Sequence, residues 1–235
     1  MSNMKLGVVG GMGPMATSMF FERIIKKTMA TKDQEHMDMV ILNHATMPDR
    51  TEAIITGNDA LFLSHIEHDF KMLEMMDVAY IAIPCNTSHF FMEEMIKLTH
   101  IPIINMVEET AKEIKVRYGV GKKVGILATN GTIQTGTYER ACLNHGLLFE
   151  KPSPADQETV MKIIYDIKSD LPIEKEQLEQ IIMKMVTVNQ CDCVILACTE
   201  LSLIKLKKDV ARFCVDAMDV LVERAIVYSG KQLKP

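Results

Sequence analysis

Two apolar runs, each ending at a cysteine, constrain this chain more than any other feature of its sequence. The runs 81–84 and 194–197 lead into Cys85 and Cys198, and polar residues that include a threonine follow each cysteine. Short apolar runs rich in β-branched residues are typical of central parallel strands, and the polar residues behind them predict the start of a helix. We therefore expect both thiols at the carboxyl ends of strands, where open α/β sheets bind ligands.

The cysteine turns belong to a longer internal repeat. Segment 124–132 aligns with segment 6–14 without a gap, so that Gly125 corresponds to Gly7 at an offset of 118 positions (125 − 7). The cysteines repeat at a similar offset of 113 (198 − 85). A repeat of the same order of strand, glycine turn, helix and cysteine turn indicates a duplication.

The duplication predicts an α/β fold of two similar open parallel-sheet lobes, related by a pseudo-two-fold axis, with an active-site cleft between them. We expect lobe 1 to comprise residues 1–110 and 217–235, because the last helix returns to it. Lobe 2 is then expected to comprise residues 111–216. The pseudo-two-fold axis would bring the two cysteine turns onto opposite walls of the cleft.

Composition and charge exclude several functional classes. The chain has 235 residues, 48% of them hydrophobic, and a formal net charge of -5 without a basic cluster. These values argue against a nucleic-acid partner. No apolar run approaches the ~20 residues that span a bilayer, so we expect no membrane partner. The N-terminal residues lack the pattern of a signal peptide, and we expect a cytoplasmic protein with reduced cysteines.

Two further motifs bear on cofactors. The glycine turn at residues 10–14 would let a ligand approach the backbone, and the helix behind it favours an anion. It does not match the glycine pattern of a dinucleotide site, so we expect no nucleotide cofactor. Cys191 and Cys193 are separated by one residue and have no further ligand at metal-binding spacing, so no metal site is expected.

Two thiols on opposite walls of a cleft suit a reaction that needs an acid and a base on opposite faces of one carbon. Racemisation at Cα is such a reaction, since one thiolate removes a proton and the other thiol returns one. A cysteine pKa of ~8.5 is lowered by a helix N-terminus, which we expect behind both thiols. The remaining cysteines, at positions 142, 191, 193 and 214, lack these surroundings and are interpreted as packing residues.

Several motifs in the chain resemble those of the aspartate/glutamate racemase superfamily, and in particular its aspartate racemase branch. They are Gly-Gly-Met-Gly-Pro at 10–14, Pro-Asp-Arg-Thr at 48–51, Pro-Cys-Asn-Thr-Ser-His at 84–89, Ala-Thr-Asn-Gly-Thr-Ile at 128–133 and Cys-Thr-Glu-Leu at 198–201. The resemblance covers nearly the whole chain. One departure is Asp216-Ala217-Met218, where relatives often have Asp-Thr-Thr.

The resemblance implies a cofactor-independent aspartate racemase, and a homodimer, that acts by a two-base mechanism on a small acidic amino acid. Cys85 and Cys198 would be the catalytic thiols, and the presence of both implies racemisation in both directions. Arg50 and Lys168 would hold substrate carboxylates, although from the residues alone Arg50 is equally a solvated loop arginine and Lys168 a cation at a helix C-terminus. The other implied substrate-binding residues are Met12, Asn86, Thr87, Thr129 and Thr199, and Glu200 is a candidate to assist the second thiol.

Other functions stay open at this point. Glutamate or other amino acids are alternative substrates for a racemase. Decarboxylases and cis-trans isomerases of dicarboxylic acids share the expected fold and use one or both thiol positions. A two-lobed protein that binds a small anion without turnover is the non-enzymatic alternative, and the Pro-Asp-Arg-Thr loop favours aspartate among all of these.

Overall fold

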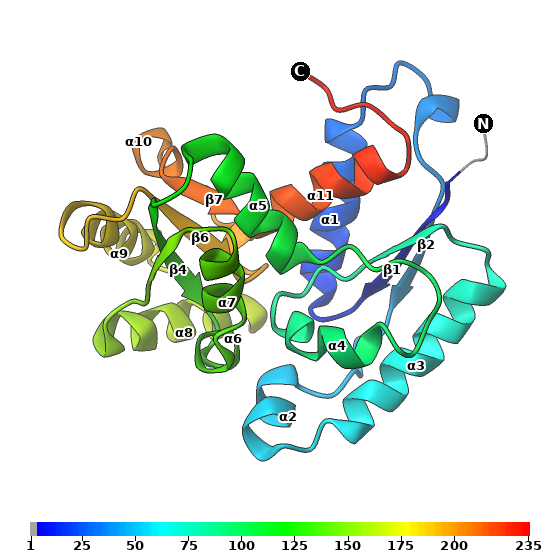
Figure 1. The fold of residues 1–235 in the computed structure, drawn as a ribbon, viewed down its shortest axis with the longest axis horizontal. Coiled ribbons are helices and arrows are strands. Elements are labelled where there is room, and N and C mark those ends of the chain that lie inside the picture. Colours follow the sequence, from blue (N-terminus) through cyan, green and yellow to red (C-terminus); the bar gives the residue numbers. More distant parts are fainter. Residues whose placement is uncertain (1–3) are drawn as a thin grey trace.

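The structure, a computed structural model, describes residues 4–235 and contains two parallel β-sheets (Figure 1). The first sheet has the strand order β2-β1-β3, and the second has the order β5-β4-β6-β7. The strands are β1 (Leu6–Gly10), β2 (Met39–Asn43), β3 (Tyr80–Ala82), β4 (Lys123–Ala128), β5 (Leu148–Glu150), β6 (Cys193–Ala197) and β7 (Cys214–Asp216). β1, β4 and β6 have neighbours on both sides, which agrees with their almost continuous apolar sequences.

The two sheets have the same topology. β1 and β4 are equivalent central strands, flanked by β2 and β5 on one side and by β3 and β6 on the other. Even the outer strand β7 has a counterpart, since Ile103 forms a parallel bridge with Ile81 at the free edge of β3. This repeated order confirms the predicted α/β fold of two similar parallel-sheet lobes.

The two central strands each contain a glycine at the equivalent position, and both glycines are closely packed. A Cβ atom added to Gly7 would lie 2.9 Å from a methyl carbon of Val78, and one added to Gly125 would lie 2.9 Å from the methyl carbon of Met185. Both contacts are too close for a larger residue without movement of the neighbour. The repeated glycines therefore permit close packing against the strand in both lobes.

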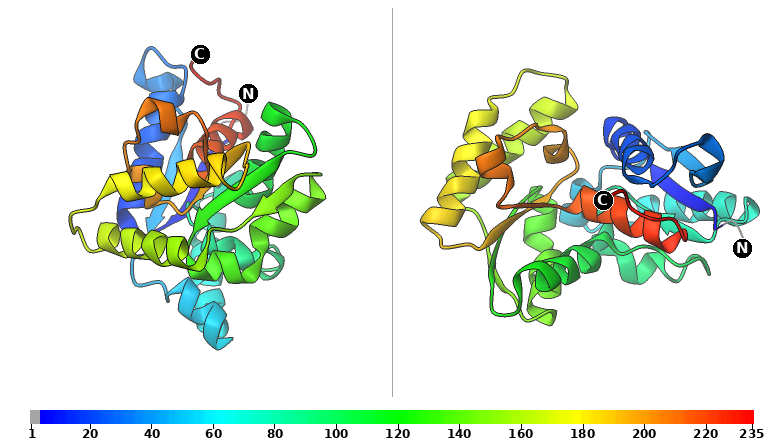
Figure 2. Two further views of the ribbon diagram at one scale, coloured as in Figure 1. Left: turned by 90° about the vertical axis from the view of Figure 1, so that its left-hand side faces the viewer. Right: turned by 90° about the horizontal axis from the view of Figure 1, so that it is seen from above.

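The helices cover the two sheets and connect them. They are α1 (Pro14–Lys27), α2 (Arg50–Thr56), α3 (Ala60–Met75), α4 (Met92–Met95), α5 (Met106–Tyr118), α6 (Asn130–Thr135), α7 (Thr137–Asn144), α8 (Pro154–Lys168), α9 (Lys175–Thr187), α10 (Lys208–Ala211) and α11 (Ala217–Tyr228). The last helix, α11, packs against both α1 and α5. Seen from above, α8 and α9 lie at the end of the molecule away from the N-terminus (Figure 2).

Helix α11 lies at the centre of the largest hydrophobic cluster. Its buried residues, including Leu221 and Ile226, share this cluster with Val8 of the first sheet and with Ile126 and Ile195 of the second. A helix with apolar residues on most sides must be surrounded by protein, because its exposed apolar area would otherwise be large. The shared core joins the lobes through this helix.

The segments after the two cysteines differ from the prediction. We expected an α-helix behind each thiol, but 3₁₀-helices follow at Thr87–Phe91 and Leu201–Leu203, and neither has a side-chain N-cap hydrogen bond. Short 3₁₀ turns align few peptide groups, so their effect on a nearby thiol is weaker than that of a long α-helix. Within residues 4–235, no helix combines the length and apolar character that a bilayer crossing requires.

Candidate active site

A cavity with about 420 Å³ of empty space brings together every site residue that the sequence predicted. Residues from both cysteine turns line it, together with the glycine turn, the start of α2 and the end of α8. The predicted residues that line it are Met12, Arg50, Cys85, Asn86, Thr87, Thr129, Lys168, Cys198, Thr199 and Glu200. The cavity therefore combines two thiols, two cations and several hydroxyl and amide groups.

Each thiol stands just beyond a strand. Cys198 directly follows β6, and Cys85 follows β3 after Ile83 and Pro84. Both cysteines are free, and each is only 5% exposed. The carboxyl ends of parallel strands are where α/β folds place ligands, so the local fold accounts for the position of both sulfurs.

The thiol of Cys198 has a charged hydrogen-bond partner. Its Sγ atom donates to Oε2 of Glu200 at 2.9 Å, while Oε1 of the same carboxylate accepts a hydrogen bond from Nζ of Lys168. Burial, and then the charge of Glu200, raise the pKa of Cys198 well above the usual value for a thiol. The expected lowering of this pKa is wrong, because burial and a carboxylate outweigh Lys168 and the local backbone.

The surroundings of Cys85 contain no carboxylate at an equivalent position. Asn86 and Thr87 follow it, and Nδ1 of His89 lies 2.9 Å from the Cys85 carbonyl oxygen. Burial lowers the pKa of His89, so its imidazole is neutral at neutral pH. This turn is thus built from uncharged groups, whereas the other turn holds an ion pair.

Arg50 is placed by the first turn of α2, which Asp49 caps by accepting a hydrogen bond from the backbone N–H of Glu52. One terminal nitrogen of Arg50 donates to the carbonyl oxygen of Pro48 at 3.0 Å. Its Nε atom is buried and has no hydrogen-bond partner within residues 4–235. A buried guanidinium donor left open in a cavity suits an anionic ligand.

Lys168 supplies the second cation from the last turn of α8. Burial alone would lower its pKa, but the Glu200 carboxylate outweighs burial and raises the pKa above the usual value. The lysine therefore carries its charge at neutral pH. A substrate carboxylate that binds Lys168 must share it with Glu200 or displace it from Glu200.

Three threonine hydroxyls link the lobes beside the cavity. Oγ1 of Thr87 lies 3.1 Å from Oγ1 of both Thr129 and Thr132, and these two oxygens are 3.2 Å apart. Thr129 also caps α6 by accepting from the Thr132 N–H. Thr132 was not among the predicted site residues, although it belongs to the motif at 128–133.

Four other residues that line the cavity were not predicted from the sequence. Asp49 and Thr51 line it next to Arg50, and Ile164 and Tyr165 line it from α8. The first two belong to the motif at 48–51, which was the signal available for them. Ile164 and Tyr165 follow ordinary helical periodicity, so nothing local to their sequence separates them from packing residues.

A second, more apolar pocket adjoins the cavity and shares Arg50, Lys168 and Glu200 with it. It has about 670 Å³ of empty space, and Met15 and Leu203 are among the residues that line it. The two charged partners Lys168 and Glu200 therefore stand between a polar inner cavity and a less polar outer pocket.

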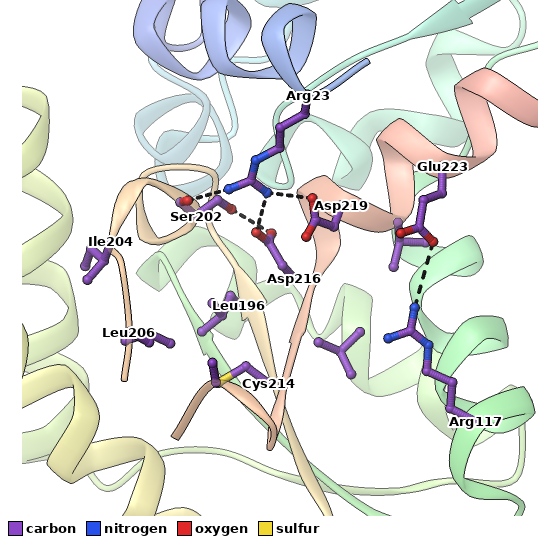
Figure 3. A pocket seen from close by; sticks show the side chains of 13 residues that line it. Arg23, Arg117, Leu196, Ser202, Ile204, Leu206, Cys214, Asp216, Asp219 and Glu223 are labelled. Atoms are coloured by element: carbon purple, nitrogen blue, oxygen red, sulfur yellow. Dashed lines mark hydrogen bonds and ion pairs between the residues drawn. The ribbon is translucent and has the colours of Figure 1, made fainter. Parts of the chain in front are cut away.

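A third pocket, with about 710 Å³ of empty space, has neither Cys85 nor Cys198 in its lining (Figure 3). Arg23 lines it and binds Asp216, Asp219 and the carbonyl oxygen of Ser202. Asp216 also caps α11 by accepting a hydrogen bond from the Met218 N–H, and it does not line the cavity that contains the two thiols. The pocket is a structural ion-pair cluster.

Known proteins resemble this chain over most of its length. Residues 9–225 match the family model described as Asp/Glu/Hydantoin racemase. A broad-specificity amino-acid racemase from Bacillus subtilis is 31% identical over 204 residues, which cover 84% of this chain and 86% of that protein.

Solved structures show the same fold. An aspartate racemase from Picrophilus torridus superposes with a TM-score of 0.83 and 29% identity, covering 98% of this chain and 96% of that one. An aspartate racemase homologue from Pyrococcus horikoshii gives a TM-score of 0.79 at 21% identity, with 97% and 99% coverage, and supports the fold alone. The extent of the family match and the identity to the Bacillus protein lead to one conclusion: the chain belongs to the Asp/Glu/hydantoin racemase family.

Proposed function

We propose that this protein interconverts L- and D-aspartate by a two-base mechanism in which Cys85 and Cys198 act on opposite faces of Cα. The observation that carries the proposal is the shared cavity: one thiol from each lobe lines it together with Arg50 and Lys168. Two cations suit a substrate with two carboxylates, and two thiols suit proton transfer on both faces. The aspartate racemase of Picrophilus torridus, at 29% identity, supports the same choice of substrate.

The reaction from the L-enantiomer begins with formation of a thiolate at Cys198. Its thiol proton passes to Glu200, which already accepts a hydrogen bond from Sγ at 2.9 Å. The thiolate then removes the Cα proton of L-aspartate, and the electron pair of the C–H bond stays on the substrate as a carbanion. Resemblance to the family is the basis for assigning Cys198 to this enantiomer.

The second half of the reaction takes place on the other face. The Cys85 thiol transfers its proton to the planar carbanion, which forms the Cα–H bond of D-aspartate and leaves a thiolate at Cys85. Arg50 and Lys168 hold the carboxylates and stabilise the negative charge that develops during the first step. No cofactor or metal takes part in the proposed reaction. Before the next turnover of L-aspartate, Glu200 releases its extra proton and the Cys85 thiolate takes one up, both by exchange with solvent. The D-enantiomer reacts by the same steps in reverse.

Broader racemase specificity is the second candidate function. The outer pocket supports it, because Met15 and Leu203 line space that adjoins the cavity beyond Lys168 and Glu200. A side chain longer and less polar than that of aspartate would reach this space. The similar Bacillus protein carries the description of a broad-specificity amino-acid racemase.

A substrate panel tests the proposal. We would incubate purified protein with a chelator and a reductant, without pyridoxal phosphate, and follow the enantiomer ratio of aspartate, glutamate, methionine and leucine. Conversion of aspartate with the highest kcat/KM is expected. Preference for methionine or leucine would favour the second candidate, while turnover of malonates or maleate alone would point to a decarboxylase or an isomerase. Binding of aspartate without turnover would favour the non-enzymatic alternative.

A further inference from the structure

We infer that Tyr138 is a positioning residue, which orients the side-chain amide of Asn86 so that its N–H groups face the substrate. This inference deepens the proposed function and rests on it. Tyr138 lies on α7 of the second lobe, outside the set of residues that line the cavity, while Asn86 belongs to the cysteine turn of the first lobe. The contact between them therefore crosses from one lobe to the other.

The geometry of the contact is well defined. The Tyr138 hydroxyl donates a hydrogen bond to Oδ1 of Asn86 at 2.5 Å, and the tyrosine side chain is fully buried. Burial raises the pKa of Tyr138 far above its ordinary value, while a hydrogen bond with Thr110 acts in the opposite direction. The phenol is therefore protonated at neutral pH and can act as a donor.

The donor role of the phenol decides which end of the Asn86 amide faces it. The single proton of the Tyr138 hydroxyl goes to Asn86, which requires the amide oxygen on that side, because the amide nitrogen cannot accept a hydrogen bond. The amide nitrogen of Asn86 must then point away from Tyr138. Nothing else near this amide is needed to select its orientation.

The nitrogen that is turned away has an unused donor capacity. Nδ2 of Asn86 is buried without a hydrogen-bond partner in the described part of the chain, and Asn86 is only 4% exposed. Because Asn86 lines the cavity, this N–H group is available to a ligand there. Nε of Arg50 is a second buried donor without a partner in residues 4–235, and it belongs to the same cavity.

These two donors suit a carboxylate oxygen of the substrate. A buried donor without a partner costs free energy, and a ligand that satisfies it recovers that cost. Without the phenol, the terminal torsion of Asn86 has a broad minimum and the amide can turn its oxygen toward the substrate. A carboxylate would then meet an acceptor where it needs a donor.

A double-mutant cycle tests whether Tyr138 acts through Asn86. The variants are Tyr138→Phe, Asn86→Ala and the two combined, with racemisation of L-aspartate measured as kcat and KM. Loss of one oriented donor is expected to raise KM roughly tenfold in each single variant, with kcat changed by less than about threefold. In the Asn86→Ala background, Tyr138→Phe is expected to have no further effect.

Tyr228→Phe is the matched control. The Tyr228 hydroxyl donates to Oε1 of Glu109 at 2.9 Å, so this variant also removes one phenolic hydrogen bond, but neither residue lines the cavity. We expect its KM and kcat to equal those of the wild type. A wild-type KM in Tyr138→Phe, or additive effects of the two substitutions in the cycle, would overturn the inference.

Calorimetric titration of the same variants with L-aspartate separates this inference from the proposed function. A wild type that binds but does not racemise L-aspartate would refute the proposed function. The double-mutant cycle would still test the role of Tyr138, with Kd for L-aspartate measured in place of KM. A wild type that neither binds nor racemises it would overturn both.

Should Tyr138→Phe fold poorly, Asn86→Asp tests the part of the inference that assigns a substrate-binding N–H group to Asn86, with the tyrosine in place. Its carboxylate accepts the phenolic hydrogen bond but has no N–H group for the substrate. We expect a folded protein that binds L-aspartate at least about tenfold more weakly than the wild type. Unchanged affinity in this variant would overturn the inference.

Discussion

The two cysteine turns occupy equivalent places in equivalent sheets, yet their chemical surroundings differ. Cys198 donates to Glu200, which is paired with Lys168, and its pKa is raised. Cys85 is followed by Asn86, whose amide oxygen accepts from a tyrosine of the other lobe. The two thiols thus have equivalent positions in the repeated fold, but a carboxylate stands beside one and a neutral hydrogen-bond network beside the other.

This difference indicates that the two thiols, although they have equivalent positions in the fold, are not equivalent in proton transfer. The deprotonated form of a buried thiol is costly, so proton removal from Cys198 needs an acceptor close by. In the proposed mechanism, Glu200 is this acceptor. If the comparison is right, substitutions in the two turns will have distinct effects rather than equal ones.

The largest effect is expected when either thiol is removed. Cys85→Ser and Cys198→Ser should each lower racemisation by at least about 10³-fold, because each removes an acid or a base of the reaction. In each variant the carbanion can regain a proton only from the remaining thiol, so exchange of the Cα proton with solvent should occur for one enantiomer only, for L-aspartate in Cys85→Ser and for D-aspartate in Cys198→Ser. Chiral chromatography with mass spectrometry measures both quantities.

Cys142→Ser is the control for these variants, since Cys142 is a buried packing cysteine outside the cavity. It should racemise aspartate at the wild-type rate per folded molecule. Racemisation at the full rate in either Cys85→Ser or Cys198→Ser would refute the two-base proposal. Solvent exchange of the same enantiomer in both variants would contradict the assignment of each thiol to a different enantiomer.

A smaller effect is expected from Glu200→Gln, which keeps the shape of the side chain but removes its charge. The charge of Glu200 raises the pKa of Cys198, so the substitution should lower that pKa and increase the rate at which iodoacetamide alkylates Cys198 at pH 8. Racemisation should fall by roughly 10²-fold, since the thiol loses its proton acceptor. Alkylation of Cys85 should not change.

Glu179→Gln provides a control, because Glu179 is a buried carboxylate that pairs with Lys207 away from the cavity. We expect wild-type alkylation rates at both Cys85 and Cys198 in this variant. Slower alkylation of Cys198 in Glu200→Gln would contradict the assigned cause of its raised pKa.

The last effect concerns stability in the second lobe, which holds the packing cysteines. Burial raises the pKa of Cys142, Cys193 and Cys214 to about 12, and that of Cys191 to about 11. In the unfolded chain these thiols titrate at about 8.5, so the stability that their folded-state protonation contributes is complete below that pH. It is lost as the pH rises toward the folded-state values, by about 1.4 kcal/mol per thiol for each pH unit. Urea unfolding between pH 8 and 10.5 measures this decline.

Cys142→Ala tests the origin of the decline. Removing one buried thiol should make the fall in unfolding free energy shallower by about 1.4 kcal/mol per pH unit. Val160→Ala, which deletes two buried methyl groups in the same lobe, should lower stability at every pH without changing the slope. Equal slopes in Cys142→Ala and the wild type would contradict the raised pKa of Cys142.

Much of the fold could be predicted from sequence because its signals are local and repeated. The apolar runs before Cys85 and Cys198 indicated the strands, and the glycines at positions 7 and 125 marked the duplication. The carboxyl ends of parallel strands then predicted where the thiols lie. All of this follows from periodicity and from one topological rule.

The remaining features depend on contacts between residues distant in sequence. The orientation of Asn86 is set by Tyr138, which is 52 positions away and has no local signal of such a role. The raised pKa of Cys198 depends on burial and on Glu200, while sequence reasoning had relied on a helix dipole. The 3₁₀ turns behind both cysteines were also not predicted, because the residue pattern does not distinguish one turn of 3₁₀-helix from the first turn of an α-helix.

The most direct test of the two-base account is a single incubation of the wild-type protein with L-aspartate in heavy water, stopped early in the reaction. Two bases on opposite faces predict that the D-aspartate formed carries deuterium at Cα, while the recovered L-aspartate retains its protium. Deuterium entering recovered L-aspartate as fast as it enters D-aspartate would contradict two separate bases. D-aspartate that forms without deuterium would mean that the abstracted proton itself returns to the other face, which would contradict a separate second base.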